Sequence, residues 1–283
     1  MSSLSTKIDF AVIIRVNHAN PNGDPLNGNR PRTDYNGYGE ISDVCLKRKL
    51  RDRLQESGAA IFVQSDDRKN DDATSLQGRA IKALGKDFGG PETAKMACER
   101  WLDVRAFGQL FAMKSSKKKK ADSDDDGAGE TGVSIPIRGP VTVQSAFSVS
   151  PVDVTSTQIT KSVSGEGDGT KRGSDTMGMK HRVDDAVYVF FGSMNPQLAE
   201  RTGFSDADAE VIKTQLPRLF ENDASSARPE GTMRVIKVIW WKHSNKAGQY
   251  SSARVHGALK VNPDGSHSLT SLDDLQAEKI DGF

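Results

Sequence analysis

The residues best suited to bind a ligand lie in one stretch, residues 17–34, with the sequence NHANPNGDPLNGNRPRTD. Its two Asn-Gly pairs, Asn22-Gly23 and Asn27-Gly28, are strong turn formers because both residue types tolerate a positive φ. Three prolines stiffen the chain around these turns. Arg30 and Arg32 add guanidinium groups that can pair bidentately with a phosphate. The stretch therefore predicts a rigid, outward-facing loop that can bind an anion.

Other interpretations of this loop stay open. A P-loop is excluded because G-x-x-x-x-G-K-[ST] is missing from the sequence. His18 could act as a general base with Asp24 or Asp34, although a single histidine at a strand end more often serves as a hydrogen-bonding residue. An ordered loop without a ligand is a further alternative. A calcium loop would lack its closing bidentate glutamate, and its ligands would be Asn20, Asn22, Asp24 and Asn29.

A basic helix is predicted directly after the loop, over residues 44–56. Ser42 or the residue after it can cap this helix, and leucines at every fourth position form its apolar stripe. Lys47 and Arg51 lie one turn apart on one face, with Arg48 beside them. Such a charged face is often only solvated, but next to the Asn/Arg loop it can also meet phosphate.

A polar arm is predicted further along the chain. Residues 150–180 hold little core material and have a Gly/Asp/Ser-rich tip at 164–174, which is typical of a protruding β-hairpin. Met177 and Met179 would be adaptable apolar surface in this arm, able to wedge beside a nucleobase or to pack on a neighbouring subunit. Three residues flank the methionines and could contact phosphate: Lys161, Lys180 and His181.

The remaining segments must position this loop, helix and arm, and they predict an α+β fold. The expected strands are residues 8–16, 133–149, 183–191, 233–241 and 253–261, with 103–111 as a short strand or turn. The other expected helices are 74–85, 92–102, 197–201 and 205–220, and a polar tail begins at 262. A four-stranded antiparallel sheet with two crossing helices accommodates this order in the ferredoxin-like manner, which is also the architecture of the RRM.

Composition limits what the chain can be. Its 283 residues suit one elaborated domain, 1–283, and 39 Lys+Arg against 38 Asp+Glu leave a net charge of only +1. A nucleic-acid partner would therefore require positive charge gathered on one surface. Two distant cysteines and no long apolar stretch favour a reducing, cytoplasmic location without a membrane span. Residues 114–132 combine a lysine block with an acidic run, so a disordered charged insert is expected there.

Several of these segments, taken in order, resemble the Cas-seven family, the backbone subunit of the CRISPR surveillance complex Cascade. The subtype they resemble most is type I-C, the Csd-two group. The most specific match is NPNGDP at residues 20–25, followed by GN at 28–29 and PRTD at 31–34. The other matching segments are the basic helix and residues 103–108, 139–141, 158–160, 176–181, 203–205 and 225–231.

The resemblance implies a ferredoxin-like or RRM-like palm, a helical fingers insertion at residues 64–102 and a β-hairpin thumb at 155–181. It implies a subunit that polymerises along CRISPR RNA and presents the spacer for pairing with a target DNA strand in antiviral defence. The implied partners are other copies of the chain, a five-group Cas subunit, a large subunit and small subunits. It implies no catalysis, no metal and no cofactor. The lysine block at 117–120 departs from the family pattern, as does Met179, where relatives often carry arginine.

A backbone that holds any spacer sequence must contact phosphates and 2′-hydroxyls in preference to base edges. The alternative is a ribonuclease, because related type III subunits cleave target RNA with an aspartate after the first strand, a place that Asp24 or Asp34 could occupy. The residues expected to contact RNA are Asn17, His18, Asn20, Asn22, Asn27, Asn29, Arg30, Arg32, Ser42, Lys47, Arg48, Arg51, Lys161, Met177, Met179, Lys180 and His181.

Overall fold

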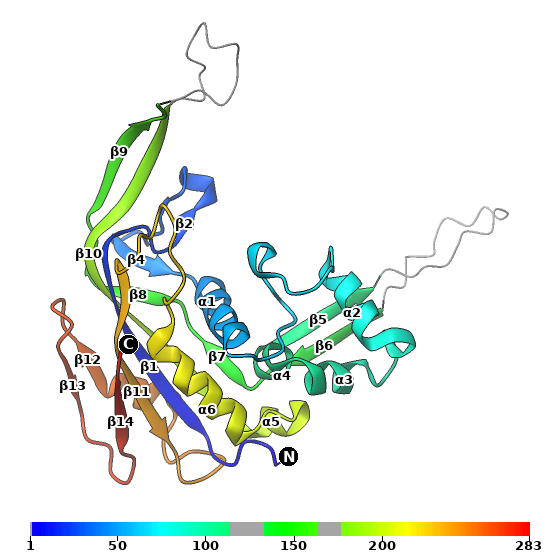
Figure 1. The fold of residues 1–283 in the computed structure, drawn as a ribbon. Helices are drawn as coiled ribbons and strands as arrows, with labels where there is room; N and C mark the ends of the chain where they lie inside the picture. The colour runs from blue at the N-terminus through cyan, green and yellow to red at the C-terminus, as the bar shows by residue number, and fades with distance from the viewer. Residues whose placement is uncertain (1, 114–132, 163–176) are drawn as a thin grey trace, which may run out of the picture.

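The computed structural model describes residues 2–113, 133–162 and 177–283 (Figure 1). The charged insert expected at 114–132 lies outside the described residues, as does the tip of the expected hairpin, 164–174. Within the described ranges, no helix combines the length and the apolar character needed to cross a membrane.

An antiparallel sheet forms the centre of the molecule (Figure 1). Its central strand, β1 (Ile8–Ala19), pairs with β10 on one side and with β11 on the other. The residues of β1 from Ile8 to Ile14 are all buried, which explains why their sequence is a continuous apolar run interrupted only by Asp9. The order along the sheet is β14 (Ala277–Asp281), β11 (Met233–Lys242), β1, β10 (Met177–Met194), β8 (Ala146–Pro151) and β4 (Tyr38–Ile41), with β7 (Val141–Val143) and β9 (Val154–Thr160) also paired to β10.

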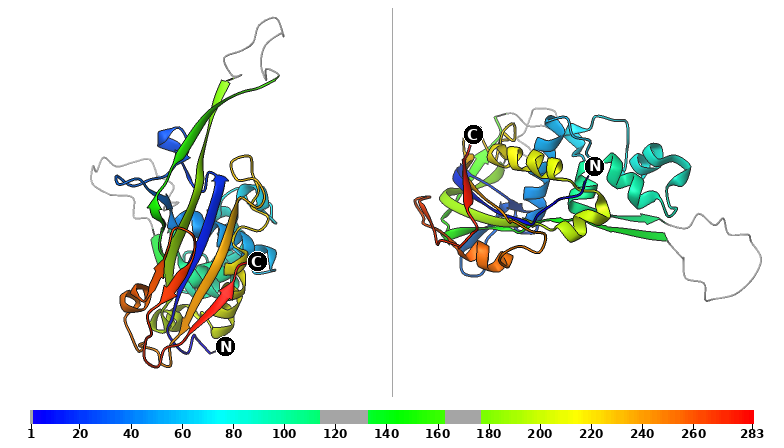
Figure 2. Two further views of the ribbon diagram at one scale, coloured as in Figure 1. Left: turned by 90° about the vertical axis from the view of Figure 1, so that its left-hand side faces the viewer. Right: turned by 90° about the horizontal axis from the view of Figure 1, so that it is seen from below.

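Both faces of the sheet are covered (Figure 2). On one face, α1 and α6 share an apolar cluster with Phe10 and Trp240, whose rings stack with centroids 5.6 Å apart. On the other face, Trp241 packs with α7 and with the hairpin of β12 and β13. The bounds of the covering elements are α1 Asp43–Glu56, α5 Pro196–Thr202, α6 Asp206–Gln215, η5 Leu216–Arg218, α7 Ser252–Gly257, β12 Leu259–Val261 and β13 His267–Leu269.

The two helices on the first face begin at residues that the sequence indicated. Ser42 Oγ accepts a hydrogen bond from the Cys45 N–H at 3.4 Å and caps α1. Ser205 caps α6 in a capping box with Asp208. The expected helix at 205–220 is thus confirmed, with its last turn, η5, in the tighter 3₁₀ form.

A group of short helices packs around a second apolar cluster, built on Phe62, Trp101 and Phe111. Asp103 connects this cluster to α1. Its carboxylate accepts hydrogen bonds from the Phe62 N–H at 2.7 Å and the Val63 N–H at 3.0 Å, and it pairs with Arg51 of α1 at 3.0 Å. The elements of this group are η2 Asp66–Arg68, α2 Leu76–Leu84, η3 Gly85–Asp87, α3 Thr93–Arg100, α4 Leu102–Phe107, β5 Gly108–Met113 and β6 Val133–Arg138.

Three segments differ from expectation. Residues 103–111 begin as helix α4, because the buried bonds of Asp103 hold that turn, and strand β5 starts only at Gly108, where φ is 82°. Residues 253–261 begin as helix α7, because Ser251 caps it, and only β12 is strand. The polar tail supplies β13, which pairs with β12, and the edge strand β14, which pairs with β11. With β14 included, the main sheet has eight strands in the described parts of the chain, where four were expected.

A buried carboxylate, Asp9, lies at the start of β1 and contacts three basic side chains. His243 Nε2 lies 2.9 Å from Asp9 Oδ2, Lys7 Nζ lies 3.1 Å from the same oxygen, and His256 Nε2 lies 3.4 Å from Oδ1. Burial alone would raise the pKa of Asp9. Hydrogen bonds from His243, His256 and Ser252 and the charge of Lys7 outweigh burial and hold this pKa well below its usual range.

The Asp9 cluster predicts an acid-sensitive contribution to stability. Because the folded-state pKa is lowered, the contribution is fully present above the unfolded-state pKa, about 3.9, and is lost as pH falls through the folded-state value. Urea unfolding of the wild type between about pH 5 and pH 3 should show a free energy of unfolding that falls more steeply than that of Asp9→Asn. Parallel pH profiles for the two proteins would contradict this assignment.

Asp103→Ala should lower the free energy of unfolding by about 3–5 kcal/mol, because it leaves a largely buried arginine and two backbone N–H groups without their partner. Urea denaturation measures this loss. Asp72→Ala, which removes a fully exposed carboxylate from the same group of short helices, is the matched control and should change stability by less than about 0.5 kcal/mol. An equal effect of the two substitutions would contradict the role of Asp103 in connecting the second apolar cluster to α1.

Candidate nucleic-acid interface

The loop at 17–34 and the arm of β9 and β10 leave the sheet at the same end (Figure 1). The pairing of β1 with β10 sets this arrangement, since Asn17 lies opposite Asp185 and Ala19 opposite Val183. Beyond Val183, β10 continues into the arm and pairs there with β9 as far as Met177 and Thr160. His18 Nδ1 lies 3.6 Å from Asp184 Oδ1 at the foot of the arm. The loop and the arm therefore form neighbouring sides of one surface.

The loop is held in shape by its own polar groups. It contains a small hairpin of β2 (Gly23–Asp24) and β3 (Arg30–Pro31) around the short helix η1 (Pro25–Asn27). Asp24 caps η1 by accepting from the Leu26 N–H at 3.2 Å. Gly28 takes a left-handed conformation, as expected for the second Asn-Gly pair. Gly23 does not, because it begins strand β2. A glycine is still required at this position, since a Cβ would collide with the Asn29 side chain.

Several expected RNA-contacting residues support the loop from inside. Asn22 Oδ1 accepts hydrogen bonds from both the backbone N–H and the hydroxyl of Ser42, each at 2.9 Å, so these two side chains join the loop to the first turn of α1. Asn20 is buried and donates from Nδ2 to the Asn29 carbonyl oxygen at 2.7 Å. These residues position the surface, and Asn22 Oδ1 and Asn20 Nδ2 are already engaged within the protein.

The basic face expected on α1 is largely neutralised inside the fold. Lys47 pairs with Asp43 at 2.9 Å, and Arg48 pairs with Asp52 and donates to a backbone carbonyl. The Arg51 side chain is 14% exposed and bound to Asp103. Burial lowers the pKa of Arg51, and the adjacent Asp103 carboxylate counteracts that effect. Lys47 and Arg51 thus each have a carboxylate partner, and Arg51 turns toward the short helices, so their contact with phosphate stays a prediction.

The arm carries exposed apolar and cationic side chains. Met177 is 64% exposed and Met179 is 54% exposed, and both point to the same side of β10 because they are two residues apart. Lys180 is also exposed, and it points to the other side of the strand. Lys161 is exposed just beyond the end of β9. His181 differs, because it is buried and its Nδ1 lies 2.8 Å from Ser156 Oγ, which gives it a role within the hairpin.

The remaining expected residues are exposed or partly exposed around the loop. Asn27, Asn29 and Arg30 are exposed at the small hairpin, and Arg32 is partly exposed beside Asp24, with 3.6 Å between Nη2 and Oδ1. His18 is exposed, and Asn17 donates from Nδ2 to Asp185 at 3.3 Å. The outer surface thus combines amides, guanidinium groups and the ammonium groups of the arm.

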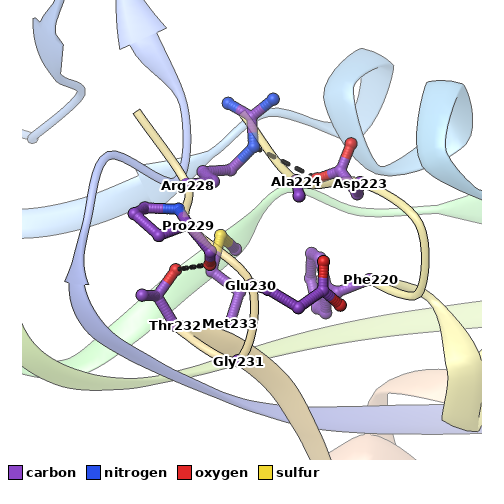
Figure 3. Close-up of a pocket in the computed structure, with 9 residues that line it drawn as sticks. All are labelled: Phe220, Asp223, Ala224, Arg228, Pro229, Glu230, Gly231, Thr232 and Met233. Atoms are coloured by element: carbon purple, nitrogen blue, oxygen red, sulfur yellow. Dashed lines mark hydrogen bonds and ion pairs between the residues drawn. The ribbon is translucent and has the colours of Figure 1, made fainter. Parts of the chain in front are cut away.

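A third segment borders the loop, although it was not among the expected contacts. Residues 223–232 form a tight loop that lines the pocket drawn in Figure 3. The Asn20 N–H donates to the Ala227 carbonyl oxygen at 2.9 Å, and the Asn17 N–H donates to the Thr232 carbonyl oxygen at 2.8 Å. The motif at 225–231 was the available signal, but sequence alone did not place it beside residues 17–34.

Two comparisons with known proteins point to the same family. The family model described as CRISPR-associated protein Cas7 matches residues 6–280. A protein described as CRISPR-associated protein Cas7 from Haloferax volcanii is 29% identical over 265 residues, which cover 90% of this chain and 75% of that protein.

Two solved chains are also similar to this one. A chain described as CRISPR RNA-guided surveillance complex, pre-nicking, has a TM-score of 0.45 at 14% identity, covering 83% of this chain and 78% of that chain. A chain described as CRISPR RNA-guided surveillance complex has a TM-score of 0.42 at 16% identity, covering 83% of this chain and 69% of that chain.

The bonds between Asn22 and Ser42 predict coupled effects on stability. Asn22→Ala and Ser42→Ala should each lower the free energy of unfolding by about 1–2 kcal/mol, because each removes a partly buried hydrogen-bonding partner and Ser42→Ala also removes the cap of α1. The double variant should lose less than the sum of the two, since both changes break the same contact. Urea denaturation of the four proteins measures the coupling, and strict additivity would contradict the contact.

Proposed function

The chain belongs to the Cas7 family of CRISPR-associated proteins, and from that membership we propose that it is a non-catalytic, RNA-binding backbone subunit of a type I-C surveillance complex in the cytoplasm. It polymerises along CRISPR RNA and presents the spacer for pairing with a target DNA strand. Its other partners are a five-group Cas subunit, a large subunit and small subunits. The observation that carries the proposal is the surface on which the Asn/Arg loop and the Met/Lys arm leave one end of the sheet side by side.

The order of the elements supports a ferredoxin-like palm. The strand order β11-β1-β10-β8 places the fourth, first, third and second strands of that unit side by side. α1 follows the first strand, α6 connects the third to the fourth, and both helices cover the same face. In this proposal the helical insertion at 64–102 is the fingers, and the hairpin at 155–181 is the thumb.

The exposed groups suit an RNA backbone of any sequence. Arg30 and Lys180 offer positive charge to phosphates, and the amides of Asn27 and Asn29 can bond phosphate or 2′-hydroxyl oxygens. Met177 and Met179 supply a soft apolar edge at the thumb, where a base can be displaced from its stack without being read. We retain these residues, together with Asn17, His18, Arg32 and Lys161, as the proposed RNA contacts.

The two loop aspartates have structural roles that support a scaffold over a ribonuclease. Asp34 Oδ1 accepts hydrogen bonds from the Asn36 N–H and the Tyr38 N–H, each at 2.9 Å, and so closes a turn. Asp24 caps η1 and faces Arg32. Both carboxylates therefore shape the loop. We propose that neither acts as a catalytic residue.

The purified wild type should carry RNA, and the variant Arg30→Gln/Lys180→Gln should bind single-stranded RNA more weakly at every sequence tested. Each lost phosphate contact should reduce the slope of log K against log salt by about 0.7. The matched control is Arg201→Gln/Lys246→Gln, which removes two exposed charges from the opposite end of the sheet. Fluorescence anisotropy over a salt series measures both quantities.

Two outcomes would contradict the scaffold proposal. A wild-type protein that binds no RNA would contradict its role as an RNA-binding backbone subunit. Divalent-dependent cleavage of RNA that is lost in Asp34→Ala would instead show a ribonuclease, because that substitution removes the carboxylate and leaves the arginines of the loop in place.

A further inference from the structure

We propose that residues 223–232, named here the Arg228 loop, form a further part of the RNA interface, and that Arg228 binds a phosphate of the RNA backbone there. The inference rests on the proposed function, because it assigns a ligand of the same surface to a segment outside the loop, helix and arm described above. Its ligand is a phosphodiester oxygen pair, which a guanidinium group can bind with two parallel hydrogen bonds.

The Arg228 loop is fixed against the end of β1. Its Ala227 and Thr232 carbonyl oxygens accept hydrogen bonds from the N–H groups of Asn20 and Asn17. Those two residues begin the Asn/Arg loop, so the two loops share a border of backbone bonds. A phosphate that contacts one loop at this border is within reach of the other.

The backbone around Arg228 is held in a tight turn. Ser225 and Arg228 exchange two backbone hydrogen bonds, of 2.8 Å and 3.1 Å, and Ser225 Oγ accepts a third from the Arg228 N–H at 3.2 Å. Pro229 follows, and its carbonyl oxygen accepts hydrogen bonds from both the backbone N–H and the hydroxyl of Thr232. A long side chain on such a fixed turn loses less conformational freedom when it binds.

The guanidinium group of Arg228 is positioned on one side and open on the other. Its Nε donates to Asp223 Oδ2 at 3.1 Å. In the described parts of the chain, neither terminal nitrogen, Nη1 or Nη2, has a protein partner. In Figure 3 these nitrogens point away from Gly231 and Met233, and the Glu230 carboxylate lies on the Phe220 side of the pocket, away from them.

The local charge balance leaves this guanidinium group able to take an anion. Asp223 is shared, because the ammonium group of Lys49 contacts the same carboxylate oxygen. The Lys49 side chain is 5% exposed, whereas that of Arg228 is 26% exposed. Two cations thus face one carboxylate, and the more exposed cation is Arg228.

A third cation lies nearby. Burial raises the pKa of the Cys45 thiol and the Asp223 carboxylate adds to that rise, while the positive charges of Lys49, Arg228 and Arg32 act against it. All three cations are therefore close enough to Cys45 to act on it. Cys45 lies in the first turn of α1, with its sulfur 4.0 Å from the Pro21 carbonyl oxygen. Arg228 consequently extends the cationic side of the Asn/Arg loop across the start of α1.

Arg228→Gln tests the proposal with purified full-length protein freed of copurified nucleic acid. The probes are a labelled oligouridylate and a labelled unstructured RNA of mixed sequence. Loss of one charged, bidentate contact should weaken binding to both probes by roughly tenfold and reduce the salt slope by about 0.7. Arg201→Gln on α5, which removes an exposed arginine at the other end of the sheet, is the control and should leave both values unchanged.

A second variant separates a phosphate contact from a purely structural bond to Asp223. Arg228→Lys keeps the charge without the forked geometry, so it should retain the wild-type salt slope and bind more tightly than Arg228→Gln. If Arg228→Gln keeps the wild-type affinity and slope while the wild type binds both probes, the inference is overturned and the proposed function stands. If the wild type binds neither probe, both fail. If Arg228→Gln does not fold, folded Arg228→Lys that binds both probes as tightly as the wild type would overturn the inference, because the proposed contact needs the forked guanidinium group.

Discussion

The pairing of β1 with a strand on each side is the constraint on which the rest of the structure depends. The strand is buried from Ile8 to Ile14, and its register with β10 is continuous from Ile8 opposite Met194 to Asn17 opposite Asp185. A slip of one residue would exchange the two faces, so the two apolar layers that cover the sheet hold this register in place. The same register decides that the Asn/Arg loop leaves beside the strand that becomes the arm. The composite surface therefore follows from the core and not from direct attraction between its parts.

A nearly neutral chain can still present a cationic surface because many charges in the described parts of the chain pair within the fold. Arg51 is bound to Asp103, Lys49 to Asp223, and Arg105 to Asp208 with two hydrogen bonds of 2.7 and 3.0 Å. These pairs are largely buried and join one layer to the next. The cations that remain exposed on the loop and the arm are few, and their position matters more than their number.

Sequence alone predicted the parts of the fold whose signals are local. The apolar run of β1 and the serine caps Ser42 and Ser205 correspond to elements of the structure. The polar edge strand β14 was missed because an edge strand is held mainly by backbone bonds to β11 and needs no apolar pattern. Helix α4 was missed because the buried bonds of Asp103 with residues some forty positions away stabilise it.

The candidate site shows the same division between local and distant information. The sequence identified a stiff loop rich in amides, but it could not separate amides that face outward from those that hold the loop together. Asn20 and Asn22 satisfy partners inside the protein, whereas Asn27 and Asn29 expose their side chains. A loop without regular secondary structure must satisfy its backbone groups with nearby side chains, and asparagine is suited to both tasks. Loss of RNA binding on replacing an asparagine here therefore identifies a contact only when the stability of the loop is unchanged.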